Sequence, residues 1–161
     1  MKTLYVMDPI DRIDPLGDST YMMILDVQRR GWRAWCCTPG ELFTLGGDGW
    51  VRCCAVQVNG EHGATLVGGA PEELPLGDFD VVWMRKDPPF NMDYVFCTYI
   101  LDLVPPRTLV LNRPAGLRNC NEKMVALRWP ELCPPTLVTR DIARALAWIE
   151  RAPAKVVLKP W

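Results

Sequence analysis

The chain has 161 residues, of which 49% are hydrophobic and 23% are charged, and its formal net charge is −1. This composition is typical of a globular protein long enough to bury a core, and it excludes a disordered tail or a fibre. A nearly neutral chain without runs of lysine or arginine argues against binding to nucleic acid or to an anionic membrane. No apolar run approaches the roughly 18 residues of a membrane span, and the N-terminal apolar stretch is too short for a signal peptide, so we expect a cytoplasmic protein.

Seven cysteines, four of them in two adjacent pairs, lack the Cys-x-x-Cys spacing of a zinc site; they lie at positions 36, 37, 53, 54, 97, 120 and 133. Neighbouring side chains on a strand face opposite sides, so Cys36–Cys37 and Cys53–Cys54 are expected to be small packing residues in a reducing compartment. A redox or metal role is the less favoured alternative.

The first forty residues predict a strand, a helix and a second strand. The apolar run Leu4–Met7 is closed by Asp8-Pro9, which fits a strand that ends in a turn. After a loop, Asp18–Thr20 supplies N-cap candidates for a helix over Tyr21–Arg30, and Arg33–Thr38 is predicted to be the second strand. A crossover of this length implies that the two strands pair in parallel.

The next segment predicts a β-hairpin. A glycine-rich stretch, Gly46–Gly49, separates Glu41–Leu45 from the β-rich Trp50–Val58. A phosphate-binding loop is the alternative, but no helix follows and the Gly-x-Gly-x-x-Gly spacing is absent. Asn59–Gly69 is predicted to be an exposed loop that carries the single histidine, His62, so no triad or histidine-based metal site is available within this chain.

The middle of the chain continues the alternation of strands and helices. We expect a strand over Val81–Met84, a helix from Asn91 or Met92 to Leu103, and a short strand over Thr108–Leu111. From Asn119 an N-cap and a short amphipathic helix are predicted, closed by Pro130. Together these elements predict an α/β fold with a small parallel sheet up to about residue 120.

The last forty residues are predicted to open a second unit. Thr136–Val138 and Lys155–Leu158 have the composition of strands, and Thr139 or Asp141 is expected to cap a helix between them. Helical spacing joins the apolar residues of this helix into one stripe, which we interpret as core; its members are Ile142, Leu146 and Ile149.

Charged residues follow two of the predicted strands. Arg85-Lys86-Asp87 comes directly after Val81–Met84, at the sheet edge where open α/β folds place their ligands. One interpretation is a solvated strand end with a local ion pair; the other is that Arg85 binds a substrate carboxylate while Lys86 and Asp87 orient it. Asp8 and Ser19 would line the same edge, although capping or turn roles explain them equally well.

Two lysines differ from the other lysines in their position relative to the predicted elements. Lys159 ends an apolar run before Pro160, and Lys123 lies in the first turns of a predicted helix, an unusual place for a cation because of the helix dipole. Each is either an ordinary surface lysine or a mobile point charge for phosphate.

Several blocks of the sequence resemble the prokaryotic glutathione synthetases, a family of ATP-grasp ligases. The blocks occur in the family's order and are spread over nearly the whole chain: Val6–Ile10, Gln28–Gly31, Met84–Phe90, Asn112–Pro114, Asn121–Lys123 and Pro135–Arg140. The resemblance implies a Rossmann-like pre-ATP-grasp domain with a mainly parallel sheet over residues 1–120, followed by the start of an ATP-grasp domain over residues 121–161.

The resemblance also implies an activity. The family uses ATP and Mg²⁺ to phosphorylate γ-glutamylcysteine, and glycine then attacks the acyl phosphate to give glutathione. By this resemblance Lys123 and Lys159 contact the phosphates of ATP, Arg85 contacts the peptide substrate, and the full-length enzyme is a homo-oligomer.

The family's phosphate-covering loop and Mg²⁺ ligands follow the point at which this sequence stops, so we expect no metal site and no ligase activity from these 161 residues alone. The alternative to the N-terminal part of a synthetase is a non-catalytic binding or oligomerisation module that retains the Rossmann-like domain. Truncation would also leave apolar side chains exposed near Val156–Trp161.

Overall fold

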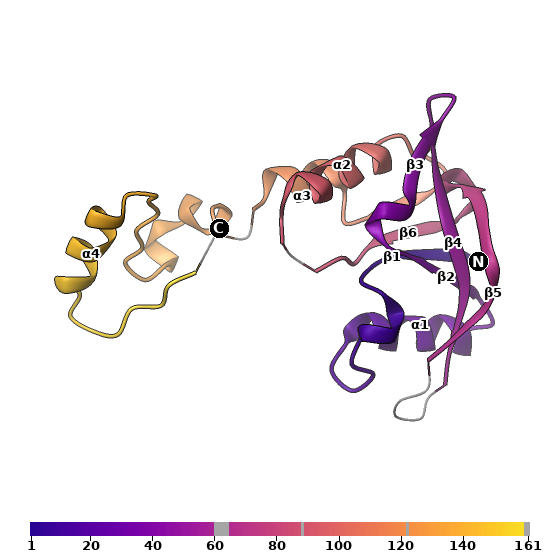
Figure 1. The fold of residues 1–161 in the computed structure, drawn as a ribbon, viewed down its shortest axis with the longest axis horizontal. Coiled ribbons are helices and arrows are strands. Elements are labelled where there is room, and N and C mark those ends of the chain that lie inside the picture. The colour runs from indigo at the N-terminus through magenta and orange to yellow at the C-terminus, as the bar shows by residue number, and fades with distance from the viewer. Residues whose placement is uncertain (60–64, 88, 122, 160–161) are drawn as a thin grey trace. The chain divides into compact units, whose positions relative to one another are not determined.

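The computed structural model describes residues 1–59, 65–87, 89–121 and 123–159, with only the backbone of residues 65–69. The chain forms two compact units, Met1–Asn119 and Cys120–Trp161 (Figure 1). The sheet and its covering helices belong to the first unit.

One mixed sheet forms the centre of the first unit. Its strand order is β3-β4-β2-β1-β6-β7, and β5 pairs with β4. The strands β2, β1, β6 and β7 pair in parallel, which confirms the expected α/β fold, whereas β3, β4 and β5 join through antiparallel pairs. The strands are β1 (Lys2–Val6), β2 (Arg33–Cys37), β3 (Leu42–Leu45), β4 (Asp48–Val58), β5 (Thr65–Pro75), β6 (Val81–Met84) and β7 (Leu109–Leu111).

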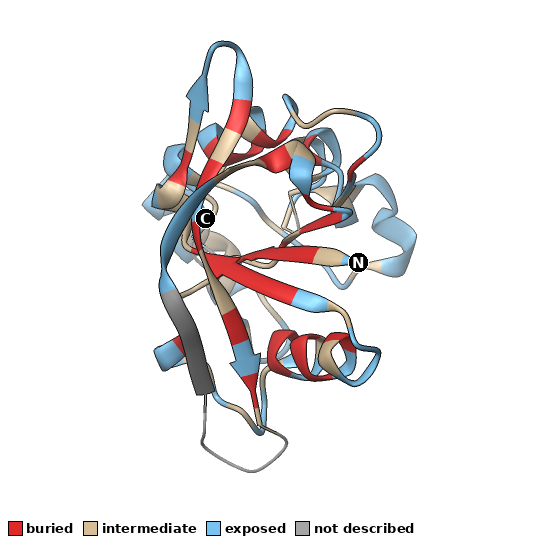
Figure 2. Cartoon of the chain, turned by 90° about the vertical axis from the view of Figure 1, so that its right-hand side faces the viewer, coloured by how far each residue is buried: buried red, intermediate tan, exposed pale blue. Residues whose placement is uncertain are grey.

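Helices cover both faces of the sheet. Figure 2 shows that the strands in the middle of this sheet are largely buried. Alternate side chains of β1 and of Met7, the residue after it, point to opposite faces, so Leu4 and Val6 join a core with residues of α2, while Tyr5 and Met7 join a second core with residues of α1. The α-helices of this unit are α1 (Ser19–Arg29), α2 (Met92–Leu101) and α3 (Pro114–Asn119), and the 3₁₀ helices are η1 (Ile10–Arg12), η2 (Pro39–Glu41) and η3 (Leu76–Asp78).

Both ends of α1 are capped by the residues that the sequence indicates. The Asp18 carboxylate accepts a hydrogen bond from the backbone N–H of Thr20 at 2.6 Å. At the other end Gly31 has φ +71°, its N–H donates to the Gln28 carbonyl, and the Trp32 N–H donates to the Val27 carbonyl. These two bonds form a Schellman motif, which reverses the chain into β2.

The predicted hairpin is confirmed. Leu45 pairs with Asp48 at the end of the β3–β4 ladder, and the two residues between them, Gly46 and Gly47, have φ of +63° and +92°. Positive φ at both positions is typical of a type I′ turn, whose twist matches the strands it joins. These glycines therefore serve the turn and do not cradle a phosphate.

The predicted loop over Asn59–Gly69 is wrong for its second half. Thr65–Gly69 belong to the strand β5, which pairs with β4 in an antiparallel ladder and continues to Pro75. Glycine and proline lower the local preference for a strand, but the unpaired edge of β4 supplies backbone partners that outweigh this preference. His62 lies outside the described residues.

The cysteine pairs on the strands have the packing role that the sequence predicts. Cys37 and Cys53 are buried in the core on the α2 side of the sheet, whereas Cys36 is buried in the core on the α1 side. The opposite facing of Cys36 and Cys37 follows from the pleat of β2. Cys54 is only half-buried, and all four thiols are free.

The second unit departs from its predicted strands. Thr136–Val138 and Lys155–Leu158 form no strand, because the described residues of this unit offer them no ladder. The helix expected from Asn119 to Pro130 is wrong, because the described residues of this segment form only the 3₁₀ turn η4 (Val125–Arg128) and α3 already ends at Asn119. A second 3₁₀ turn, η5 (Pro130–Leu132), follows.

The predicted helix near residue 141 is present as α4 (Ile142–Glu150), and Asp141 caps it by accepting the Arg144 N–H at 3.1 Å. Its apolar stripe is not core, however, since Ile142 is 76% and Leu146 is 55% exposed. An amphipathic stripe is buried only where a neighbouring element packs on it, and the described part of this unit supplies none for these two residues. Val157 and Leu158 are also exposed.

Among the described residues, no helix has both the length and the apolar character that crossing a bilayer would require.

Candidate functional site

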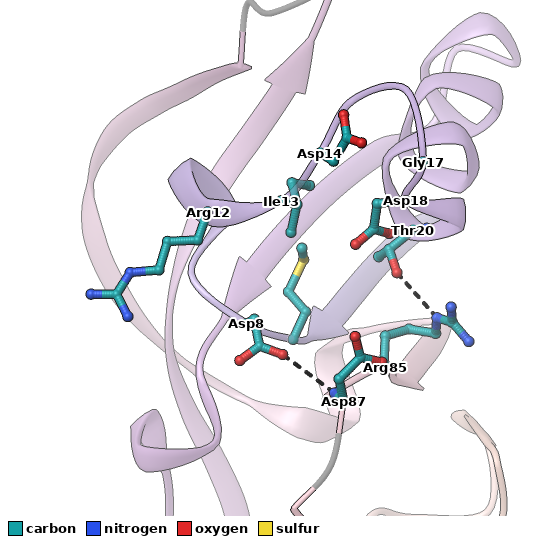
Figure 3. Close-up of a pocket in the computed structure, with 10 residues that line it drawn as sticks. Asp8, Arg12, Ile13, Asp14, Gly17, Asp18, Thr20, Arg85 and Asp87 are labelled. Atoms are coloured by element: carbon teal, nitrogen blue, oxygen red, sulfur yellow. Dashed lines mark hydrogen bonds between the residues drawn. The ribbon is translucent and has the colours of Figure 1, made fainter.

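The carboxyl ends of β1 and β6 lie side by side and open into a pocket. The Arg85 backbone N–H donates to the Val6 carbonyl at 2.8 Å, so the parallel ladder continues to the point where both strands leave the sheet. The pocket has a volume of about 470 Å³ (Figure 3). It is lined by residues of the β1–α1 loop, the start of α1 and the segment after β6: Met7, Asp8, Arg12, Ile13, Asp14, Gly17, Asp18, Thr20, Arg85 and Asp87.

Arg85 is held in place by the first turn of α1. Its Nη2 donates to the Ser19 hydroxyl at 2.8 Å, and its Nε donates to the Thr20 hydroxyl at 3.2 Å. A guanidinium has five N–H donors, so these two bonds orient the group and leave donors for a ligand. The side chain is half-buried, which limits competition from water.

Asp8 ties the loop after β1 to the segment after β6. Its Oδ1 lies 3.1 Å from the Lys86 ammonium, and its Oδ2 accepts the Asp87 backbone N–H at 3.3 Å. The ion pair of Lys86 therefore reaches across to the neighbouring strand end. Because both Asp8 oxygens are engaged, this carboxylate fixes the shape of the pocket wall.

The β1–α1 loop contributes two further carboxylates. Asp14 Oδ1 accepts the Leu16 N–H at 3.0 Å, which shapes the turn, and Asp18 Oδ1 caps α1. A Cβ at Gly17 would lie 3.0 Å from Asp14 Oδ2, so a side chain at this position would crowd the loop. Figure 3 shows Asp14, Asp18 and Arg85 on the loop, helix and strand-end sides of one hollow.

The charges around the pocket suit a zwitterionic ligand. Two cations, Arg12 and Arg85, and four carboxylates line it, and no hydrogen bond or ion pair is seen for the Arg12 guanidinium among the described residues. A guanidinium binds a carboxylate through paired N–H donors, and a carboxylate binds an ammonium group. The site can therefore hold an amino-acid-like group by both of its charges.

The structure brings Asp8, Ser19 and Arg85 together, as expected for one sheet edge, but gives them different positions. Asp8 and Arg85 line the pocket, whereas Ser19 contacts Arg85 from the start of α1. Arg12 and Asp14 were not identified as site residues from the sequence, because they lie in the predicted loop before the first helix and no role was assigned to them. Their signal is the recurrence of charged residues directly after the first strand.

Lys123 and Lys159 belong to the second unit. Asn121 Oδ1 accepts the backbone N–H of Lys123 at 2.9 Å, so this lysine lies in a capped turn before η4. Lys159 is exposed and follows an irregular segment in place of the expected strand. Their expected contacts with ATP remain predictions.

Within the described ranges, no group of three or more histidine, cysteine, aspartate or glutamate side chains is arranged to hold a metal ion. We therefore assign no step through Mg²⁺ to these residues.

The comparisons with known proteins agree with the family suggested by the sequence. Residues 1–118 match the prokaryotic glutathione synthetase, N-terminal domain. The chain is 44% identical over 137 residues to the glutathione synthetase of Yersinia pestis, covering 84% of this chain and 43% of that protein. It is 40% identical to the glutathione synthetases of Bradyrhizobium diazoefficiens over 154 residues and of Escherichia coli K12 over 158 residues, covering 96% of this chain and 49% of each relative.

The chain thus spans about half the length of the curated relatives it matches. The family match covers the whole sheet, α1, α2, all but the last residue of α3, and the pocket between β1 and β6. From this match we conclude that the chain belongs to the prokaryotic glutathione synthetase family and corresponds to its N-terminal part.

Proposed function

We propose that this chain is the N-terminal part of an ATP-dependent ligase that joins γ-glutamylcysteine to glycine. The family membership of residues 1–118 and the relatives' name, glutathione synthetase, support this proposal. On the same basis we propose that residues 1–120 are a Rossmann-like pre-ATP-grasp domain and that residues 121–161 begin the ATP-grasp domain. We also propose, from the family resemblance, that the full-length enzyme is a homo-oligomer. Analytical ultracentrifugation of the full-length protein tests this.

We further propose that the pocket between β1 and β6 binds γ-glutamylcysteine. The observation that carries this proposal is the orientation of Arg85 by Ser19 and Thr20, which leaves guanidinium donors for a ligand carboxylate. The glutamyl end of the dipeptide carries an α-carboxylate and an α-ammonium group. The carboxylate pairs with Arg85, and the ammonium group pairs with Asp14 or Asp18 in the same pocket.

The contribution of the pocket to the reaction is positioning. A phosphoryl or acyl transfer of this kind depends on holding the reacting groups in place and neutralising their charge. Arg85 fixes one end of the peptide, while the Asp8–Lys86 pair holds the segment on which Arg85 lies. ATP and Mg²⁺ supply the phosphorylation when bound to the full enzyme, and Lys123 and Lys159 are proposed to contact the ATP phosphates.

Titration calorimetry with γ-glutamylcysteine tests the pocket. Arg85→Gln removes a charged hydrogen-bond donor, so we expect the Kd to rise about 10- to 100-fold. The matched control is Arg29→Gln, because Arg29 is exposed in the last turn of α1, away from the residues that line the pocket. Equal affinity of the Arg85 variant and the unchanged chain would refute a role for Arg85 in binding.

A further inference from the structure

Four cysteines lie on two neighbouring antiparallel strands of the first unit. Cys36 on β2 is the direct register partner of Cys54 on β4. The preceding pair of that ladder, Trp35 and Ala55, shows that the register is regular at this point. The strands therefore place two thiols opposite each other on one face of the sheet, the face that α1 covers.

This placement satisfies the main geometric requirement of a disulfide. Directly opposite residues of an antiparallel pair have Cα atoms about 4.5 to 5.5 Å apart, whichever of the two kinds of pair they form. Disulfides are found at Cα separations of about 4.4 to 6.8 Å. Cys37 and Cys53 point to the other face, where both are buried in the core with α2.

The two thiols of the Cys36–Cys54 pair differ in their access to reagents. The β4–β5 ladder shifts register between Cys53 and Ala55, so Cys54 lies at an irregularity and is half-buried. Cys36 is buried, and this burial, followed by the charge of Cys54, raises the pKa of the Cys36 thiol to about 12. A reagent from solution therefore meets Cys54 first, and Cys36 reacts second through its proximity.

We propose that Cys36 and Cys54 form a modification site that a low-molecular-weight disulfide converts into a cross-strand protein disulfide. The Cys54 thiolate attacks one sulfur of the small disulfide, forms a mixed disulfide and releases one small thiolate. Cys36 then gives up its proton to solvent and attacks Cys54 Sγ, which expels the second small thiol. Two protein thiols are oxidised, one small disulfide is reduced to two thiols, and no further reagent is required.

Mass spectrometry of the chain treated with oxidised glutathione tests this proposal. The parent variant carries Cys120→Ser and Cys133→Ser, which removes the two competing thiols of the second unit. After free thiols are blocked with N-ethylmaleimide, the expected product is lighter than the reduced chain by two hydrogens and carries two fewer maleimides. Fragmentation of the non-reduced peptides is expected to locate the link between Cys36 and Cys54.

Two variants of that parent separate the register pair from its neighbours. Cys54→Ser is expected to abolish the link, whereas Cys53→Ser, on the same strand but the opposite face, leaves it unchanged. When the parent is unfolded in guanidinium chloride before oxidation, the Cys36–Cys54 link should no longer form in preference to disulfides between other cysteines. Absence of the link in the folded parent, a disulfide of Cys36 with another cysteine in Cys54→Ser at the same yield, or accumulation of glutathionylated Cys54 without closure would each overturn the proposal. The parent's peptide map decides even where a variant fails to fold.

Discussion

Gln28 fastens α1 to the end of β4, and its removal gives a sharp test of how the first unit is held together. Its side-chain Nε2 donates to the Val58 carbonyl at 2.7 Å, and its Oε1 accepts the Val58 N–H at 2.7 Å. The amide thus satisfies both backbone groups of one residue, as a neighbouring strand would. Val58 is 4% exposed, so water is a poor substitute.

The expected cost of Gln28→Ala follows from these two bonds. Each neutral hydrogen bond contributes about 1 kcal/mol net, and a buried N–H or C=O left without a partner costs about 1 to 3 kcal/mol. Some relaxation of α1 lets water reach one of the two groups, so we expect the free energy of unfolding to fall by about 2 to 4 kcal/mol.

Urea unfolding followed by circular dichroism measures this change. Gln57→Ala is the matched control, because Gln57 is the preceding residue of β4 and is exposed. Its expected effect is within about 0.5 kcal/mol of zero. If the two glutamine variants unfolded with the same free energy, the proposed bridge between α1 and β4 would not contribute to stability, and the reasoning from the two bonds would be refuted.

Three further predictions concern a helix end, pH and activity. Gly31→Ala should lower the free energy of unfolding by about 1 to 2 kcal/mol in thermal melts, because Gly31 has φ +71°, whereas Gly40→Ala should change it far less; equal effects would contradict the role of positive φ. Burial raises the pKa of both the Cys36 and the Cys53 thiols from 9.0 to about 12, so the folded state holds these protons more tightly. The contribution of these two thiols to stability should be constant below pH 9 and fall as the pH rises from 9 towards 12. Urea titrations that show less pH dependence in this range after Cys53→Ala would agree, while an unchanged profile would not. These 161 residues alone should release no ADP at an enzymatic rate from ATP, Mg²⁺, γ-glutamylcysteine and glycine, and a coupled ADP assay that shows such turnover would disprove this.

Local patterns in the sequence were sufficient for the elements whose partners are near in the chain. The cap at Asp18 and the reversal at Gly31 predict α1, and the paired glycines at 46 and 47 predict the β3–β4 hairpin. These features depend on backbone dihedral preferences and on hydrogen bonds within a few residues, which a short stretch of sequence encodes. The charged end of β6 was predictable for the same reason, since an apolar strand that stops at a cation indicates a sheet edge.

The second unit shows where local patterns fail. The stripe of Ile142 and Leu146 on α4 has the spacing of a core face, yet both side chains are exposed. The apolar runs near residues 137 and 157 have strand composition but no ladder among the described residues. Periodicity states which side of an element needs a neighbour, whereas burial and strand pairing require that neighbour to be present.

By itself, then, the sequence determined the α/β class, the order of most elements of the first unit, the family, and Arg85 as the first residue to suspect. Only the tertiary structure decided that β5 pairs with β4, that Ser19 and Thr20 orient Arg85, and that Cys54 lies opposite Cys36. The physical reason is that these contacts join residues distant in the chain. They depend on the strand order and register of the whole sheet, which no single segment encodes.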